Sequence, residues 1–431
     1  MSIAKKILQS ELANLGISHE ELSIRLRSAN IQETKASISN KISRGSFNAD
    51  FFINCLVAIE RDHIDLKNVM NKPESPRVIS TEFDEAAILS DSNSELVKPR
   101  VISLFAGCGG LDYGFHKAGY DIVYSNDIDP NVKATYEANL GTIEIKDICE
   151  VDKDSLPSCD VVLAGIPCQP FSSAGNRHST KDERGNLFLQ VMNLIDAKKP
   201  KIVLFENVRG FLSAKDDDGK LMPERIREEL SEHGYKLHYQ LLNAADYEVP
   251  QNRYRVVLVG VRDDLEHEFQ FPAPISLSKD ALTVGSVIEK PLPNGETHQV
   301  WKLSPQAENL AQFIPEGGSW KNVPYEELPE RLKKIRDDMK KYRSPNFYRK
   351  FSRAETMGTI TAASTPENSG ILHPLEPRRY SVREIARFQS FPDDYVFVNK
   401  SIPKKYKMIG NAVPCMLSYH VAQSIKSQYF S

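Results

Sequence analysis

Short apolar runs alternate with amphipathic stretches through the middle of the chain. The run Val101–Phe105 is followed by a helical pattern over Leu111–Ala118, and the same order recurs in Asp121–Tyr124 and Val132–Asn139. Further strands are expected near 160–164, 201–205 and 255–261. Repeated strand–helix–strand units are typical of a parallel sheet with helices on both faces. The sequence therefore predicts an α/β domain over 99–264, with a doubly wound, mostly parallel sheet.

Residues 1–70 have a different pattern, which predicts a small helical unit. A capping box at Ser18–Glu21 marks the start of one helix. Ile38 and Ile42 lie four residues apart, so they can face a common core. Helices are expected over Ile3–Leu15, Leu22–Leu26, Lys35–Gly45 and Phe51–Ile59.

The third of these helices has a polar and basic outer face. Two helices joined by a turn, with such a face on the second, fit helix-turn-helix DNA binding. Lys35, Lys41 and Arg44 are the residues expected to contact DNA. The alternative is a plain helical packing domain whose basic residues keep it soluble.

Three further segments complete the organisation. Residues 71–98 are rich in proline, serine and acidic residues, which indicates a linker. Residues 265–350 lose the regular alternation and carry a basic helix, Pro329–Tyr342, so a separate irregular domain is expected. A second capping box at Ser381–Glu384 begins a helix that runs to about Phe388. Residues 351–431 are therefore expected to complete the sheet domain.

Composition narrows the class of protein. The 431 residues allow two or three domains, and the net charge of -3 means that a nucleic-acid partner needs a local basic face. No apolar run approaches the roughly 20 residues of a membrane span, and no apolar signal core follows Met1. A cytoplasmic protein is expected. The six cysteines form no C-x-x-C pair and no zinc-like cluster, so free thiols and no metal site are predicted.

A thiol and a carboxylic acid follow two of the predicted strands. Cys168 lies in Ile166–Ser172 after the run Val161–Ala164, and Glu206 follows Ile202–Leu204. Open α/β sheets carry their chemistry at the carboxyl ends of strands. A thiol nucleophile beside an acid can attack and protonate a flat, electron-poor ring. The alternatives are a buried structural thiol and a salt-bridge partner.

A glycine-rich turn follows the first predicted strand. The sequence Phe105-Ala106-Gly107-Cys108-Gly109-Gly110 lets the backbone approach a ligand. Asp127 follows the second strand and is placed to accept hydrogen bonds from ribose hydroxyls, and Asp147 follows the third. Asp112 replaces the last glycine of the dinucleotide pattern, which favours a nucleoside cofactor without phosphate. The alternative is a tight strand–helix connection.

Two arginines alternate at the start of a later strand. Arg253 and Arg255 lie in Gln251-Asn252-Arg253-Tyr254-Arg255 and are expected to share one face. The alternative is a solvated strand edge.

Together these strings resemble the bacterial DNA (cytosine-5)-methyltransferases, over about 101–425. The order of the motifs carries the resemblance. After the glycine turn and Asp127 come Lys146-Asp147-Ile148, Pro167-Cys168-Gln169, Glu206-Asn207-Val208, Gln251-x-Arg253-x-Arg255, Gln389-Ser390-Phe391-Pro392 and Ile409-Gly410-Asn411-Ala412-Val413-Pro414.

The resemblance implies a role for each catalytic position. Cys168 is the expected nucleophile toward carbon 6 of cytosine, and Glu206 is expected to hold or protonate ring nitrogen 3. Arg255, supported by Arg253, is expected to contact the carbonyl of the base. The methyl group is expected to come from S-adenosylmethionine.

The resemblance also implies a cofactor set. Family members often carry Glu where Asp127 stands, so the shorter side chain here predicts a looser ribose contact. The residues expected to contact S-adenosylmethionine are Phe105, Gly107, Gly109, Asp127, Asp147, Ile148, Pro167, Leu187 and Asn411.

The implied partner is duplex DNA with a specific cytosine target. The base must be flipped out of the helix, and Ser172 and Arg177 in the loop after Cys168 are expected to close over it. Residues 265–350 match the family's target-recognition region by position. A restriction-modification setting follows, with a cognate endonuclease encoded nearby that forms no stable complex and an N-terminal unit that represses its own promoter. The alternatives are a tRNA cytosine-5 methyltransferase and a DNA-binding regulator with an inactive methyltransferase body.

Overall fold

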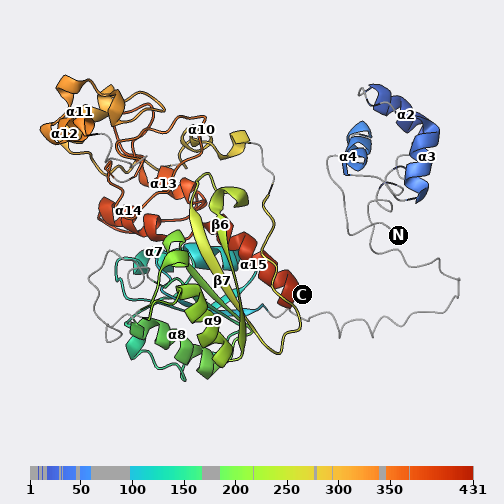
Figure 1. Ribbon diagram of the computed structural model, residues 1–431, viewed down its shortest axis with the longest axis horizontal. Helices are drawn as coiled ribbons and strands as arrows, with labels where there is room; N and C mark the ends of the chain where they lie inside the picture. Colours follow the sequence, from blue (N-terminus) through green and yellow to red (C-terminus); the bar gives the residue numbers. More distant parts are fainter. Residues whose placement is uncertain are drawn as a thin grey trace. The chain divides into compact units, whose positions relative to one another are not determined.

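The computed structural model divides the chain into two compact units, Met1–Asn93 and Ser94–Ser431. Figure 1 shows the helices and strands of each unit. The described residues are 17–28, 33–44, 49–59, 98–166, 185–216, 218–275, 279–293, 295–338, 346–367 and 369–430, together with Leu8, Leu12 and Ile31. The linker predicted over 71–98 lies outside them, except for Lys98.

The described part of the first unit consists of helices and their connections. Ile38 and Ile42 are buried in its core with Leu22 and Leu26. Of the first predicted helix only Leu8 and Leu12 are described, and both are helical and buried. The helices with described bounds are α2 (His19–Ser28), α3 (Lys35–Arg44) and α4 (Ala49–Ala58).

The second unit is built on one seven-stranded sheet with the order β3-β2-β1-β4-β5-β7-β6. The first five strands in this order are parallel, and β7 runs antiparallel to both of its neighbours, β5 and β6. The predicted doubly wound, mostly parallel sheet is confirmed. The strands are β1 (Arg100–Leu104), β2 (Asp121–Asp127), β3 (Glu144–Ile145), β4 (Val161–Ala164), β5 (Ile202–Val208), β6 (Tyr235–Asn243) and β7 (Tyr254–Arg262).

Helices cover both faces of this sheet, which explains why β1 and β4 are apolar on both sides. On one face, α6 (Gly110–Lys117) and α15 (Cys415–Tyr429) share a core with Leu163 and Leu204. On the other face, α8 (Gly185–Lys198) and α9 (Met222–Glu232) pack on Val203 and Phe205. In Figure 1, α8 and α9 lie together over the lower part of the sheet.

Two further cores lie beyond the sheet. One joins α7 (Lys133–Glu137), α10 (Val284–Ile288), α13 (Val382–Phe388) and α14 (Ile402–Asn411). The other joins α11 (Pro305–Phe313) and α12 (Glu330–Asp337) with Trp320 and Phe347. Short 3-10 helices are η1 (Ile148–Glu150), η3 (Arg209–Ser213), η4 (Ala244–Tyr247), η5 (Lys279–Leu282), η6 (Trp320–Asn322) and η7 (Tyr325–Glu327). No helix among the described residues is both long and apolar enough to span a membrane.

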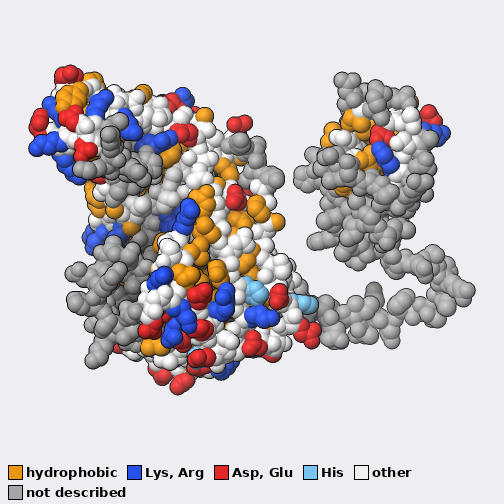
Figure 2. Space-filling view, viewed as in Figure 1, with side chains coloured by type: hydrophobic (Ala, Val, Ile, Leu, Met, Phe, Trp, Pro, Cys, Tyr) orange, Lys and Arg blue, Asp and Glu red, His pale blue; other side chains and the backbone are white. Residues whose placement is uncertain are grey.

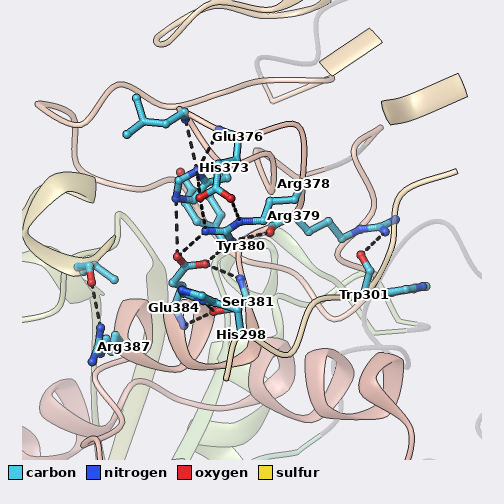
Figure 3. A network of polar contacts seen from close by, with 12 residues as sticks. His298, Trp301, His373, Glu376, Arg378, Arg379, Tyr380, Ser381, Glu384 and Arg387 are labelled. Carbon is cyan, nitrogen blue, oxygen red and sulfur yellow. Dashed lines mark hydrogen bonds and ion pairs between the residues drawn. The ribbon is translucent and has the colours of Figure 1, made fainter. Parts of the chain in front are cut away.

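A buried polar network links the irregular region to α13 (Figure 3). Arg378 donates hydrogen bonds to both carboxylate oxygens of Glu384 at 2.7 and 3.1 Å. Glu384 accepts a hydrogen bond from the backbone of Ser381, the N-cap of the helix, which confirms the predicted capping box. Arg379 lies over the ring of Trp301 and donates to its carbonyl oxygen at 2.8 Å. These contacts fix where the chain crosses between the α11–α12 core and the sheet domain.

Candidate active site

The glycine turn after β1 has the backbone geometry that its residues predict. Phe105, Gly107 and Gly109 have positive φ angles of 56°, 58° and 85°. A Cβ on Gly107 would meet no atom within 4 Å, whereas a Cβ on Gly109 would lie 2.3 Å from Leu140. Gly109 is therefore required by packing, and Gly107 leaves open space at the turn.

Asp127 binds this turn directly. Its Oδ2 accepts a hydrogen bond from the backbone N–H of Gly107 at 2.8 Å, and its Oδ1 accepts one from that of Asp129 at 2.8 Å. Burial raises the pKa of Asp127. Two main-chain donors therefore fix the carboxylate of Asp127, which is the last residue of β2, whereas the prediction placed it after the strand.

The other cofactor candidates lie on neighbouring elements. Asp147 caps η1 by accepting a hydrogen bond from the backbone of Cys149 at 2.9 Å, and Ile148 is buried behind it. Leu187 is partly buried against the α8 side of the sheet. Asn411 is exposed at the end of α14. The structure therefore distributes the set over the ends of β1, β2 and β3, α8 and α14.

Glu206 lies inside β5, which continues to Val208, rather than after the strand as predicted. Glu206 pairs in register with Val257, and Val208 with Arg255. Glu206 and Arg255 are thus diagonal neighbours on one face of two antiparallel strands.

The two side chains form an enclosed ion pair. Arg255 Nε lies 2.5 Å from Glu206 Oε1, and the side chains are only 10% and 14% exposed. Arg255 Nη1 donates to the carbonyl oxygen of Tyr254 at 2.8 Å. The guanidinium therefore fixes the orientation of the carboxylate.

Arg253 shares the buried face of Arg255, as predicted, while Tyr254 between them is 42% exposed. The terminal nitrogens of Arg253 donate to the main-chain carbonyls of Ile360, Gly410 and Ala412 at 2.6, 2.9 and 3.1 Å. Arg253 was expected to support Arg255 in its contact with the base. In this structure the terminal nitrogens of Arg253 bond to the C-terminal segments instead, so any such support is indirect.

Sequence reasoning missed the role of two buried glutamines. Gln251 donates to Gln389 Oε1 at 3.1 Å and accepts from the backbone N–H of Ile360 at 2.9 Å. Gln389 in turn donates to the carbonyl oxygen of Ile409 at 2.8 Å. Both belong to motifs quoted above, so the signal was present, but which motifs meet is decided by tertiary packing.

Sequence reasoning also missed a role for Asp112, although an aspartate in place of the last glycine of the dinucleotide pattern was a signal. Asp112 is fully buried and accepts hydrogen bonds from Ser103 at 2.6 Å and Tyr136 at 2.5 Å. The Tyr136 hydroxyl also contacts Ser125 at 2.6 Å. Burial raises the pKa of Asp112 to about 6. The carboxylate thus joins β1, β2, α6 and α7 beneath the glycine turn.

Several predicted residues lie outside the described part of the second unit. These are Pro167, Cys168, Ser172 and Arg177. Among the residues that are described, no group of three or more histidine, cysteine, aspartate or glutamate side chains is placed to hold a metal ion.

Two of the three residues of the first unit that were predicted to contact DNA, Lys35 and Lys41, form ion pairs with glutamates. Lys35 Nζ lies 2.8 Å from Glu20 Oε2, and the two side chains are 61% and 62% exposed. Lys41 contacts Glu33 and lies over the Phe51 ring. Arg44 ends α3. The basic character expected of this helix is therefore reduced at Lys35 and Lys41.

Comparison with known proteins gives two family matches. Residues 99–427 match the model described as C-5 cytosine-specific DNA methylase. Residues 2–64 match a domain of unknown function, DUF6471.

Relatives match most of the chain. The type II methyltransferase M.NgoFVII of Neisseria gonorrhoeae is 35% identical, over 78% of this chain and 89% of that protein. M.Sau96I of Staphylococcus aureus is 30% identical over 93% and 96%. The solved structure of the S. pombe Dnmt2 methyltransferase has a TM-score of 0.52 at 22% identity, over 77% of this chain and all of that one, and supports the fold.

Proposed function

The chain belongs to the C-5 cytosine-specific DNA methylase family and is a DNA cytosine-5 methyltransferase, and we propose that it uses S-adenosylmethionine to modify a specific duplex site in a restriction-modification system. The relatives carrying the name type II methyltransferase support that setting. Methylation of cellular DNA also fits the expected cytoplasmic location. It fits as well a cognate endonuclease that acts on the same DNA site.

The observation that carries the proposal is the enclosed Glu206–Arg255 pair at the edge of the sheet that holds the glycine turn. An acid oriented by a guanidinium can bind a ring nitrogen while the guanidinium contacts the adjacent carbonyl. Cytosine presents such a nitrogen, N3, beside its carbonyl at carbon 2.

The residues of the turn fit the proposed cofactor. The open space at Gly107 admits a ligand close to the backbone, and the fixed carboxylate of Asp127 suits ribose hydroxyls. S-adenosylmethionine has those hydroxyls and lacks phosphate, and when bound it supplies an electrophilic methyl group. The proposed cofactor set is Phe105, Gly107, Gly109, Asp127, Asp147, Ile148, Pro167, Leu187 and Asn411.

The proposed chemistry assigns one task to each catalytic side chain. The Cys168 thiolate bonds to carbon 6 of the flipped base, while Glu206 donates a proton to N3, which neutralises the negative charge that develops on the ring and leaves Glu206 as a carboxylate. Arg255 keeps Glu206 in position and contacts the base carbonyl. The electron pair of the 5,6 double bond moves to carbon 5, which accepts the methyl group. A base then accepts the carbon-5 proton, the N3 proton returns to Glu206, and the 5,6 double bond re-forms as the bond from carbon 6 to the Cys168 sulfur breaks.

The remaining parts of the chain have proposed DNA roles. The segment 265–350 reads the target sequence, and Ser172 and Arg177 close over the flipped base. The helical unit of residues 1–70 binds the protein's own promoter through α3. A footprint at that promoter tests the last point: loss of protection on deletion of 1–70 supports it, and equal protection by both forms contradicts it.

The central experiment traps the covalent step. A duplex with 5-fluorocytosine at the site found by bisulfite sequencing should give a covalent adduct in the presence of the methyl donor, with its peptide mass at Cys168. Cys168→Ser should give no adduct and no methylation, and tRNA serves as the alternative substrate. The proposal would be overturned if no duplex formed the adduct, or if the protein methylated tRNA and not DNA.

A further inference from the structure

An arginine–tyrosine pair flanks the Glu206–Arg255 pair on the edge of the sheet. Arg209 follows β5 directly, three residues after Glu206, and Tyr254 immediately precedes Arg255. The guanidinium carbon of Arg209 lies over the Tyr254 ring, 5.7 Å from its centroid. The two residues therefore meet where β5 ends and β7 begins, beside the Glu206–Arg255 pair.

This pair faces the opposite side of the sheet from the acid. Tyr254 alternates with Arg255 along β7 and shares its face with Val256, which packs in the α8–α9 core. The arginine–tyrosine pair thus leaves the ring-binding face of Glu206 clear. It lies where β5 ends and β7 begins.

Both side chains are accessible. Tyr254 is 42% exposed and Arg209 is exposed. A Cβ on the next residue, Gly210, would meet no atom within 4 Å. Figure 2 shows apolar side chains over β6 and β7, with Lys and Arg side chains beside them. The surface at Arg209 is therefore open to a ligand.

The charge of Arg209 is available to an anion. Within the described ranges no carboxylate lies in ion-pair distance of it, whereas Arg225 and Arg262 each contact one at 2.5 and 2.6 Å. A guanidinium stacked on an aromatic ring keeps its in-plane donors free to bind phosphate in a bidentate fashion. The ring also restricts the guanidinium, which reduces the ordering needed on binding.

From this geometry we propose that Arg209, supported by the ring of Tyr254, binds a backbone phosphate of the DNA strand next to the flipped cytosine. The inference rests on the proposed function, because it takes the DNA strand that presents the cytosine to Glu206 as its ligand. It adds a DNA contact outside the 265–350 region and outside the loop after Cys168.

The chain contains a matched control pair. Arg227 of α9 lies over Tyr239 of β6 at 5.5 Å, and both are exposed. Tyr239 pairs with Leu258, four residues along β7 from Tyr254, or about 13 Å away. This pair has the same chemistry on the same face but lies away from the strand ends.

The test is the salt dependence of binding of the full-length protein to a 30-base-pair duplex that contains the target site found by bisulfite sequencing. Arg209→Met should weaken binding roughly 10-fold and reduce the slope of log affinity against log salt by about one. Arg209→Lys should retain the slope. Tyr254→Ala should weaken binding less, since the charge remains. Arg227→Met and Tyr239→Ala should match wild type.

Binding is measured without methyl transfer, so the result is separate from the fate of the proposed function. An unchanged slope for Arg209→Met overturns the phosphate contact even where wild type methylates DNA. An equal reduction of the slope in Arg227→Met also overturns it, since the effect would then be one of general surface charge. S-adenosylmethionine affinity, measured alongside, should be the same in all variants, and its loss in Arg209→Met would contradict a contact confined to DNA.

Discussion

At the level of single residues, the environment of Glu206 explains its expected reactivity. The carboxylate and its partner Arg255 are both largely enclosed. Enclosed ion pairs contribute little net stability, because desolvation offsets their attraction. We therefore attribute this pair to chemistry: it presents an oriented acid at the edge of the sheet.

Glu206→Gln should abolish most of the activity while leaving the fold intact. Glutamine has nearly the same shape but cannot deliver a proton to N3, and loss of a general acid typically lowers rates by about 10²–10⁴-fold. Single-turnover methylation with saturating S-adenosylmethionine measures this. Glu228→Gln, which removes an exposed carboxylate paired with Lys220, is the control. A wild-type rate for Glu206→Gln would contradict the assigned role.

Asp127 should govern cofactor affinity. Its carboxylate is held by two backbone donors at the end of β2, and hydrogen bonds to charged groups are worth about 1.5–3 kcal/mol. Asp127→Asn should weaken S-adenosylmethionine binding by roughly tenfold or more, whereas Asp127→Glu should retain it. Titration calorimetry provides the measurement, with Asp129→Asn as the control. Equal affinity of Asp127→Asn and wild type would exclude the ribose contact.

At the level of elements, Asp112 joins two strands and two helices beneath the glycine turn. Its ordinary pKa is 3.8, and burial raises its pKa in the folded protein to about 6. The folded state therefore holds this proton more tightly than the unfolded state does. The contribution of the group to stability is full below about pH 4, falls as pH rises toward 6 and is constant above that.

Asp112→Asn removes this pH dependence. The unfolding free energy of wild type minus that of the variant should decrease between pH 4 and 7, by up to about 3 kcal/mol. Urea denaturation at several pH values measures the difference. A difference independent of pH would show that Asp112 does not carry the shifted titration.

Removal of Arg378 should destabilise the start of α13 far more than removal of a surface arginine destabilises its surroundings, because it leaves a buried charge without its partner. Burial by itself raises the pKa of Glu384, but hydrogen bonds from Arg378 hold it below its ordinary value. Arg378→Met leaves a carboxylate that is 2% exposed without this partner, which should cost about 3–5 kcal/mol of unfolding free energy.

The matched control for that prediction is Arg353→Met. Arg353 pairs with Glu316, and the two side chains are 45% and 30% exposed, so its loss should cost at most about 1 kcal/mol. Thermal and urea denaturation compare the two variants. Equal losses would mean that enclosure of Glu384 does not set the energy.

Element boundaries illustrate what the pattern of residues missed. The strands at 121 and 202 were expected to end at Tyr124 and Phe205, but β2 reaches Asp127 and β5 reaches Val208. The added residues are polar in β2 (Ser125–Asp127) and mostly polar in β5 (Glu206 and Asn207), and apolar periodicity does not predict a strand there. Ladder pairing decides it: Glu206 pairs with Val257 on a strand about fifty residues away. The β6 strand was not predicted, although the apolar residues Tyr235, Leu237, Tyr239 and Leu241 alternate with the polar residues Lys236, His238 and Gln240.

At the level of the whole molecule, the chain consists of two units with separate cores. The four hydrophobic clusters of the second unit lie wholly within Ser94–Ser431, and the methylase family model covers 99–427. The first unit has its own core around Leu22 and Ile38.

Deletion of residues 1–93 should therefore leave a folded enzyme. Its thermal unfolding should retain the transition of the second unit, and duplex DNA should still be methylated, since every residue of the candidate active site remains. Calorimetry and a methylation assay beside the full-length chain check this. A truncated protein that folds but is inactive would show that the first unit takes part in the reaction.

The sequence by itself determined the α/β class, the order of the motifs and the family, because short apolar runs, turn glycines and strings of polar residues are local features. Only the tertiary structure decided which of these features meet. It paired Glu206 with Arg255 across two antiparallel strands, directed Arg253 to carbonyls more than 100 residues away and buried Asp112 under the turn. The physical reason is that hydrogen bonding and burial are satisfied between distant segments, and a one-dimensional pattern records which residues need a partner but not which partner they obtain.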